Sequence, residues 1–271
     1  MIAQPDDDVN MGGSEASIMD TKMIVTDLDG TLLRTDKTMS EQTKIALSKC
    51  RRSGIKAVYA TGRGGSSDRV APAELFDGRI TMNGAVAKSG DTIIHDCLIP
   101  FKIARPLLLA CDERGMKITS EISGMHYSNF NVSELWADIA NYKMVDFAQH
   151  DKDAEKIYIP NPSQEDKSFI QRFLPYELYF VETADINGFL GQIMHKEATK
   201  AKAITALAQY WDISQSEIVA FGDDYNDIEM LCDCGIGVAV ANAIDEVKAV
   251  ANQICDTNEN NGVAKWLEEN M

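Results

Sequence analysis

The chain has 271 residues, of which 45% are hydrophobic and 25% charged, and its formal net charge at pH 7 is −16. These values favour a globular protein of about two domains and exclude a disordered or collagen-like chain. The negative charge argues against nucleic acid and anionic membrane surfaces as partners, because both bind basic surfaces. No apolar run reaches the roughly 18 residues that a membrane span requires.

Residues 1–20 are acidic and rich in small side chains, and they lack the basic start and apolar middle of a signal peptide. We therefore expect a disordered arm at this end of the chain. The six cysteines form no CxxC pair, and a core of this size does not depend on disulfides. We expect reduced thiols in a cytoplasmic protein.

The first ordered segment shows a strand, a helix and a second strand. Residues 23–26 are an apolar run that ends at a polar loop beginning with Asp27. Ser40 is a suitable N-cap for a helix that ends at Gly54. The next strand covers residues 55–60. These lengths predict a βαβ unit with a right-handed crossover.

The same order of elements returns towards the C-terminal end of the chain. A doubly wound, parallel α/β core is therefore predicted from two segments, residues 21–86 and 191–271. The predicted elements of the second segment are a helix over 199–211, a strand over 217–221, a helix over 227–231 and a strand over 236–240.

The middle segment, residues 87–190, mixes short strand-like and helix-like runs and contains most of the aromatic residues. We interpret it as an inserted α+β domain. Its predicted strands cover 92–94, 156–159 and 177–181, and its predicted helices cover 101–113 and 164–174.

Polar residues follow several of the predicted core strands. Because the carboxyl ends of strands in an open parallel sheet face one crevice, these residues should meet there. Asp27 and Asp29 would point to the same side of an extended chain and repel each other. A hard cation such as Mg²⁺ would relieve this repulsion, and Asp223 would supply a further carboxylate. An isolated Asp-x-Asp-Gly is more often a turn, but the second acidic cluster weakens that alternative.

Four short sequences in this order carry a family resemblance. They are Asp27-Leu28-Asp29-Gly30-Thr31-Leu32, Thr61-Gly62-Arg63, Lys200, and Gly222-Asp223-Asp224-Tyr225-Asn226-Asp227. The set resembles the motifs of the haloacid dehalogenase (HAD) superfamily. The insertion resembles the C2B cap of the Cof-type phosphatases, and the Asn83-Gly84-Ala85 turn before it fits that family. Lys200 is followed by Ala201, where the family usually has Gly, and Lys196 and Lys202 lie nearby.

The resemblance implies a Rossmann-like core with an inserted cap and assigns roles to the acidic residues. Asp27 would be the nucleophile that forms an aspartyl-phosphate. Asp29 would protonate the leaving oxygen and then accept a proton from water. Mg²⁺ would be held by Asp27, the main-chain carbonyl of Asp29, and Asp223.

The remaining motif residues would hold the phosphoryl group. The resemblance assigns this role to Thr61, Gly62, Lys200 and Asn226. Asp227, together with Asn226, would order Lys200 and the waters of the metal. The residues alone leave Arg63 open between a phosphate contact and a structural role.

The resemblance therefore implies a Mg²⁺-dependent phosphomonoester hydrolase that acts on small phosphorylated metabolites, with sugar phosphates favoured. His126 and Tyr127 in the insertion are candidates for substrate specificity. We expect a monomer or a weak homodimer. Two alternatives stay open: a phosphomutase of the same superfamily, and a catalytically idle ligand-binding or regulatory protein on this scaffold.

Overall fold

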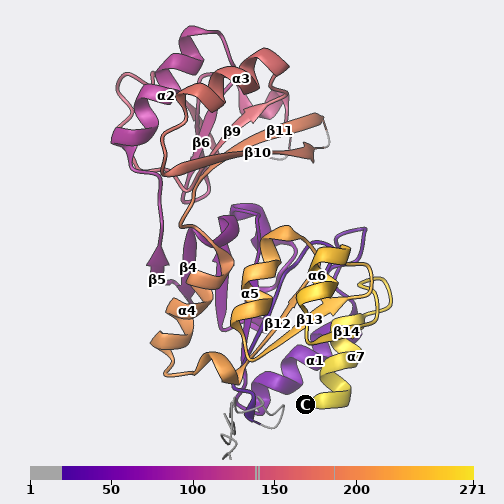
Figure 1. Ribbon diagram of the computed structural model, residues 1–271. Coiled ribbons are helices and arrows are strands. Elements are labelled where there is room, and N and C mark those ends of the chain that lie inside the picture. Colours follow the sequence, from indigo (N-terminus) through magenta and orange to yellow (C-terminus); the bar gives the residue numbers. More distant parts are fainter. Residues whose placement is uncertain (1–19, 138, 140, 186) are drawn as a thin grey trace, which may run out of the picture.

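The computed structural model describes residues 20–271 except 138, 140 and 186. Residues 1–19, where we expect a disordered arm, lie outside this part. The described chain forms an eight-stranded sheet and a six-stranded sheet, which belong to two domains stacked one above the other (Figure 1). Among the described residues, no helix combines the length and the apolar character that crossing a membrane requires.

The eight-stranded sheet forms the core domain and has the order β14-β13-β12-β1-β2-β3-β4-β5. Strand β1 is central and pairs in parallel with both β2 and β12. The chain moves outward from β1 in one direction and later returns to continue on the other side, so the predicted doubly wound α/β core is confirmed. The strands are β1 (Met23–Thr26), β2 (Lys56–Ala60), β3 (Gly78–Thr81), β4 (Val86–Ser89), β5 (Thr92–Asp96), β12 (Ile218–Gly222), β13 (Ile236–Val240) and β14 (Gln253–Cys255).

Helices cover both faces of this sheet (Figure 1). Helices α1 (Glu41–Arg52) and α7 (Gly262–Asn270) pack together on one face. Helices α4 (Lys200–Tyr210), α5 (Ile228–Asp233) and α6 (Asp245–Val250) lie on the other. The expected cap of α1 forms, because Ser40 Oγ accepts a hydrogen bond from the backbone N–H of Thr43 at 3.0 Å.

The six-stranded sheet forms the cap domain and has the order β10-β11-β9-β6-β7-β8. Helices α2 (Phe101–Glu113) and α3 (Gln164–Phe173) cover the face that points away from the core (Figure 1). These elements bury a hydrophobic cluster of their own, separate from the cluster of the core. The strands are β6 (Thr119–Ile122), β7 (Met125–Ser128), β8 (Tyr142–Met144), β9 (Lys156–Pro160), β10 (Leu178–Asp185) and β11 (Gly188–His195).

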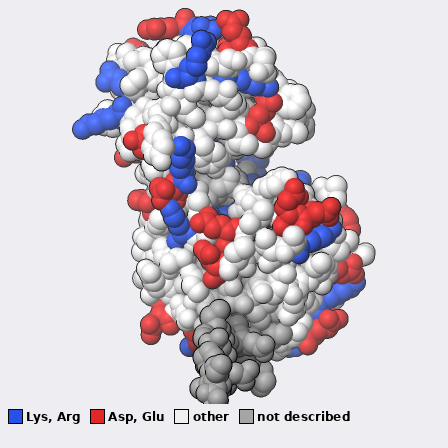
Figure 2. All heavy atoms as spheres, in the orientation of Figure 1, with Lys and Arg blue, Asp and Glu red and all other residues white. Residues whose placement is uncertain are grey.

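The chain changes sheets at other points than the boundaries expected at residues 87 and 190. Strands β4 and β5 pair in the core sheet, and β11 continues in the cap sheet to His195. An apolar strand pattern does not specify which sheet the strand joins, so the sequence did not reveal this assignment. The two connections meet where Cys97 Sγ lies 3.4 Å from His195 Nδ1. Figure 2 shows the two lobes joined at a narrow waist.

Candidate active site

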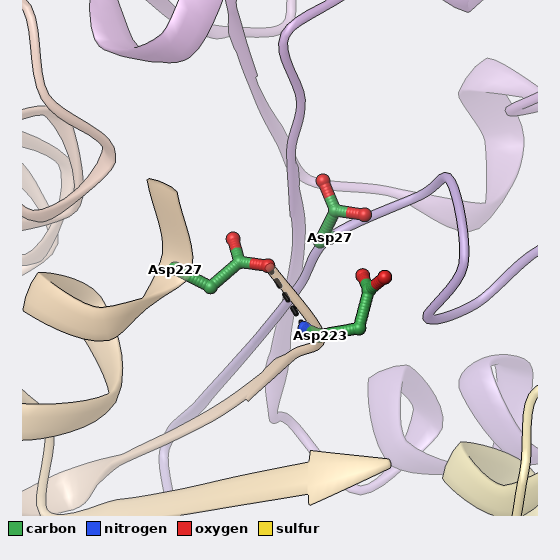
Figure 3. Close-up of side chains that lie close together, drawn as sticks. All are labelled: Asp27, Asp223 and Asp227. Atoms are coloured by element: carbon green, nitrogen blue, oxygen red, sulfur yellow. Dashed lines mark hydrogen bonds between the residues drawn. The ribbon is translucent and has the colours of Figure 1, made fainter. Parts of the chain in front are cut away.

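Three carboxylates converge at the carboxyl edge of the core sheet (Figure 3). Asp27 directly follows β1, and Asp223 directly follows the neighbouring strand β12. Asp227 ends the short 3-10 turn Tyr225–Asp227 that comes next. One carboxylate oxygen of each lies within 4.8 Å of the others. The parallel pairing of β1 with β12 brings together residues almost 200 positions apart.

Lys200 neutralises part of this negative charge. It is the first residue of α4, and its buried ammonium donates to Asp27 Oδ1 and to Asp227 Oδ1, each at 2.6 Å. Burial alone would lower the pKa of Lys200, but the two carboxylates raise it above its ordinary value. Lys202 instead pairs with Glu197 at the surface. Of these two lysines, Lys200 is therefore the one that contacts the clustered carboxylates.

Asp227 orients other groups in this cluster. Besides its bond to Lys200, its second oxygen accepts hydrogen bonds from the backbone N–H of Asp223 at 2.9 Å and of Asp224 at 3.2 Å. The Asp223 carboxylate is fixed in turn by the hydroxyl of Thr31, at 2.5 Å. Since both oxygens of Asp227 are engaged, this residue holds Lys200 and the Asp223 backbone in place.

The Asp27 carboxyl group has one oxygen without a partner. Asp27 is buried, and its Oδ2 forms no hydrogen bond. Burial, together with Asp227 and Asp223, raises the pKa of Asp27 to about 8, although Lys200 opposes this effect. Burial and the charge of Asp227 likewise raise the pKa of Asp223 to about 6. A buried, unpartnered carboxylate oxygen beside a second carboxylate fits a hard divalent cation, which prefers oxygen ligands.

Asp29 is not part of the three-carboxylate cluster and pairs instead with two cations. Arg63 donates to both of its oxygens, with Nη2 at 2.6 Å from Oδ1, and Lys37 Nζ lies 2.8 Å from Oδ1. Burial raises the pKa of Asp29, but the hydrogen bonds from Arg63 and Lys37 outweigh it and lower the pKa below its ordinary value. In this arrangement Asp29 is therefore ionised, and Arg63 has a structural carboxylate partner.

The loop after β2 carries the second motif. Thr61 is buried, and its Oγ1 accepts a hydrogen bond from the backbone N–H of Arg63 at 3.2 Å. The hydroxyl hydrogen of Thr61 thus stays available for another acceptor. Asn83 links this loop to the fourth motif, since its N–H donates to the Thr61 carbonyl at 2.9 Å and its Oδ1 accepts from Asn226 at 2.9 Å.

The turn after Asn83 packs directly against the start of α4. Gly84 has φ +105°, and a Cβ atom at this position would lie 2.1 Å from the carbonyl oxygen of Thr199, the N-cap of α4. The close approach fixes the helix end that presents Lys200. Asn83 belongs to the Asn83-Gly84-Ala85 turn that fits the family, but its link to Asn226 depends on tertiary structure.

A cavity of about 620 Å³ lies between the core loop after β2 and the cap sheet. His126 lines it, and its ring lies 5.9 Å from that of Tyr158 and 6.2 Å from that of Trp136. Burial lowers the pKa of His126 below its ordinary value, against the opposing charge of Glu121. The cavity is therefore bounded by aromatic rings and a buried carboxylate from the cap.

The two expected specificity residues lie on opposite faces of β7. Tyr127 is not among the residues that line the cavity, and its hydroxyl accepts a hydrogen bond from Lys152 at 2.9 Å. Neighbouring residues of a strand point to opposite faces, so of the two expected candidates His126 alone reaches the cavity. Glu121, Trp136 and Tyr158 also line it, and no motif in the sequence marks these residues.

The chain belongs to the haloacid dehalogenase-like hydrolases, because the model of this family matches residues 24–267. The expected superfamily and fold class are thereby confirmed. The C2B type of the cap stays a prediction.

Several known proteins are similar over almost the whole chain. The 5-amino-6-(5-phospho-D-ribitylamino)uracil phosphatase YitU of Bacillus subtilis is 28% identical, over 93% of this chain and 98% of its own. A solved HAD phosphatase from Bacteroides thetaiotaomicron is 27% identical with a TM-score of 0.76, covering 98% of this chain and 99% of its own. A solved HAD subclass IIB sugar phosphatase is 26% identical with a TM-score of 0.72, covering 92% and 98%.

Proposed function

We propose that the protein is a Mg²⁺-dependent phosphomonoester hydrolase that acts on small phosphorylated metabolites through an aspartyl-phosphate. The observation that carries this proposal is the buried Asp27, with one oxygen held by Lys200 and the other without a partner. The enzyme class is confirmed by the family match and by the phosphatase names of its relatives. The metal, the intermediate and the substrate class are our inferences.

The residues that would hold Mg²⁺ are Asp27, Asp223 and the main-chain carbonyl of Asp29. The clustered carboxylate oxygens and the unpartnered Asp27 Oδ2 support this assignment. When bound, the ion supplies positive charge that offsets the repulsion between the carboxylates and the anionic substrate. Lys200 supplies a further positive charge beside Asp27.

In the first step, an oxygen of Asp27 attacks phosphorus, and the bond from phosphorus to the leaving oxygen breaks. Lys200 holds the attacking carboxylate in place, and the Thr61 hydroxyl can donate to a phosphoryl oxygen. Asp29 gives its proton to the leaving oxygen. To become protonated, Asp29 has to separate from Arg63 and Lys37, which keep it ionised in this arrangement.

In the second step, water attacks the phosphorus of the aspartyl-phosphate. Asp29 takes the proton of this water, and inorganic phosphate leaves while the Asp27 carboxylate is regenerated. Asp227 holds the Lys200 ammonium and the Asp223 backbone in place through both steps by its hydrogen bonds to them. Asn226 donates to Asn83, which is bonded to the Thr61 carbonyl, and this link supports the phosphate-binding role that we propose for Asn226.

The cavity between core and cap supports the proposal that the substrates are small metabolites. It has room for a metabolite of ordinary size, and cap residues such as His126 and Tyr158 reach it. Sugar phosphates are favoured by the family resemblance and by the sugar phosphatase among the similar structures. The name of the YitU relative adds a phosphorylated ribitylamino compound to the substrates that we would test.

A panel of phosphorylated metabolites and one aryl phosphate, each assayed with Mg²⁺ for released phosphate, tests the proposal. We expect saturable release from the aryl phosphate and from one or more metabolites. Isomerised sugar phosphate without free phosphate would indicate a phosphomutase. If no ester turns over, a ligand-binding or regulatory role replaces the proposed function.

A further inference from the structure

Two charged side chains of the cap contact the core loop that carries Thr61, and the first of them is Lys156. The carbonyl of Gly62 accepts a hydrogen bond from Lys156 Nζ at 2.9 Å, and Lys156 belongs to β9 of the cap sheet. The neighbouring carbonyls accept from the core itself. Their donors are Asn83 N–H for Thr61, Met82 N–H for Arg63 and Ser67 N–H for Gly64.

Lys156 is buried without a carboxylate partner. Its ammonium donates to Gly62 and to Gln192 Oε1, at 3.0 Å, and it forms no ion pair with any described carboxylate. Burial lowers the pKa of Lys156 to about 8, although Glu121 opposes the shift. A buried charge of this kind is costly, so packing alone does not explain a lysine at this position.

Glu121 contacts the other end of the same loop. It lies directly opposite Lys156 on the neighbouring strand β6, and its Oε1 accepts from the Gly65 N–H at 3.4 Å. Tyr158 donates to its Oε2 at 3.0 Å. A Cβ atom on Gly64 would lie 2.3 Å from Glu121 Oε1, so glycine at this position permits the approach of the carboxylate.

We propose that Lys156 and Glu121 form a clamp, which we call the cap clamp, that positions the core loop 61–65 for phosphate binding. The ammonium holds a carbonyl and the carboxylate holds an N–H, so each charge meets the complementary end of a peptide dipole. The inference deepens the proposed function and rests on it, because it assigns Lys156 as a positioning residue for the phosphoryl transfer.

The clamp acts on the peptide unit between Gly62 and Arg63. Lys156 holds the carbonyl of this unit, and Thr61 Oγ1 accepts its N–H. Because Thr61 Oγ1 is the acceptor in this second bond, its hydroxyl hydrogen is left to donate to a phosphoryl oxygen of a bound substrate. When Lys156 moves away with the cap, the peptide unit is free to rotate and the Thr61 hydroxyl loses its alignment. Cap closure and phosphate binding are thereby coupled.

Kinetics of Lys156→Met in the full chain test the clamp. The control is Lys152→Met, which removes an exposed cap lysine that contacts Tyr127. With an aryl phosphate and Mg²⁺, we expect kcat/KM to fall about 10- to 100-fold in Lys156→Met, as for loss of a charged hydrogen bond. The control should stay within about twofold. An unchanged kcat/KM in Lys156→Met would overturn the proposal.

A double-mutant cycle with Thr61→Val separates positioning from a general structural effect. If Lys156 acts through the Thr61 hydroxyl, adding Lys156→Met to Thr61→Val should lower kcat/KM by less than about twofold. Losses that multiply would show that Lys156 acts independently of Thr61, and the proposed coupling would be wrong.

Amide hydrogen exchange separates failure of the clamp from failure of the proposed function. If the wild-type protein hydrolyses no ester, the proposed function fails, and the clamp is then judged by exchange alone. The amides of residues 62–65 should exchange faster in Lys156→Met and in Glu121→Gln than in the wild type and in Lys152→Met. Equal exchange rates in all four proteins would overturn the clamp.

Discussion

Replacing Lys200 with Met removes a buried cation that contacts two of the clustered carboxylates while keeping a side chain of similar length. Lys200 Nζ donates to Asp27 and Asp227 at 2.6 Å each, inside a region with almost no solvent exposure. Removing one partner from a buried ion pair typically costs about 3–5 kcal/mol, because the remaining charge is left uncompensated. We expect Lys200→Met to lose about this much free energy of unfolding in metal-free buffer, and less with Mg²⁺ present.

Urea unfolding followed by tryptophan fluorescence measures this loss, since Trp211 and Trp266 both pack against the core cluster. Turnover of an aryl phosphate should fall by about 10²- to 10³-fold, as when one donor to the transition state is removed. Lys202→Met is the matched control on the same helix and should change neither quantity. If Lys202→Met abolishes activity while Lys200→Met remains stable and active, our assignment of the third motif is wrong.

Four further predictions address other parts of the site. Gly84→Ala should lower both stability and turnover, because a Cβ atom there would lie 2.1 Å from the Thr199 carbonyl oxygen; thermal unfolding and aryl phosphate assays check it. Chelation should abolish turnover, and added Mg²⁺ should restore it; activity that persists in EDTA would contradict a metal site. His126→Ala should change the ranking of metabolites more than the rate on an aryl phosphate, and parallel losses on both would place specificity elsewhere. Folding lowers the pKa of Lys156 from 10.5 to about 8. At about 1.4 kcal/mol per pKa unit, burial of the charged ammonium therefore costs the folded protein about 3 kcal/mol of stability below pH 8. The wild type loses this cost as the pH rises from about 8 to about 10.5, whereas Lys156→Met has no such group. The free energy of unfolding of Lys156→Met minus that of the wild type should therefore fall over this range, and a difference that stays constant with pH would contradict the lowered pKa.

The sequence predicted the site best where local pattern and sheet topology agree. An apolar strand that stops at Asp27 and another that stops before Asp223 place both carboxylates at one edge of a parallel sheet. Lys200 followed from its motif, and the structure places it between Asp27 and Asp227. These features depend on strand ends and on helix starts, both of which leave local signals in the sequence.

Other features depend on contacts between distant segments. Strands β4 and β5 have an ordinary strand pattern, and nothing in it indicates that they pair with the core sheet. The pairing of Arg63 with Asp29 likewise cannot be predicted without the geometry of the loops that follow β1 and β2. Lys156 did leave a signal, since it is a single lysine at the start of an otherwise apolar strand. The sequence does not reveal its partner, because Gly62 lies 94 positions away along the chain.

The measurement that tests the central claim most directly is the turnover of an aryl phosphate by wild-type protein and by Asp27→Asn, both with Mg²⁺. Asn keeps the shape of the side chain but removes the anion that attacks phosphorus. With the fold intact by circular dichroism, we expect saturable phosphate release by the wild type and a loss of several orders of magnitude, roughly 10⁴-fold or more, in Asp27→Asn. Substantial phosphate release by a clean preparation of Asp27→Asn would contradict the account, because another group would then be the nucleophile.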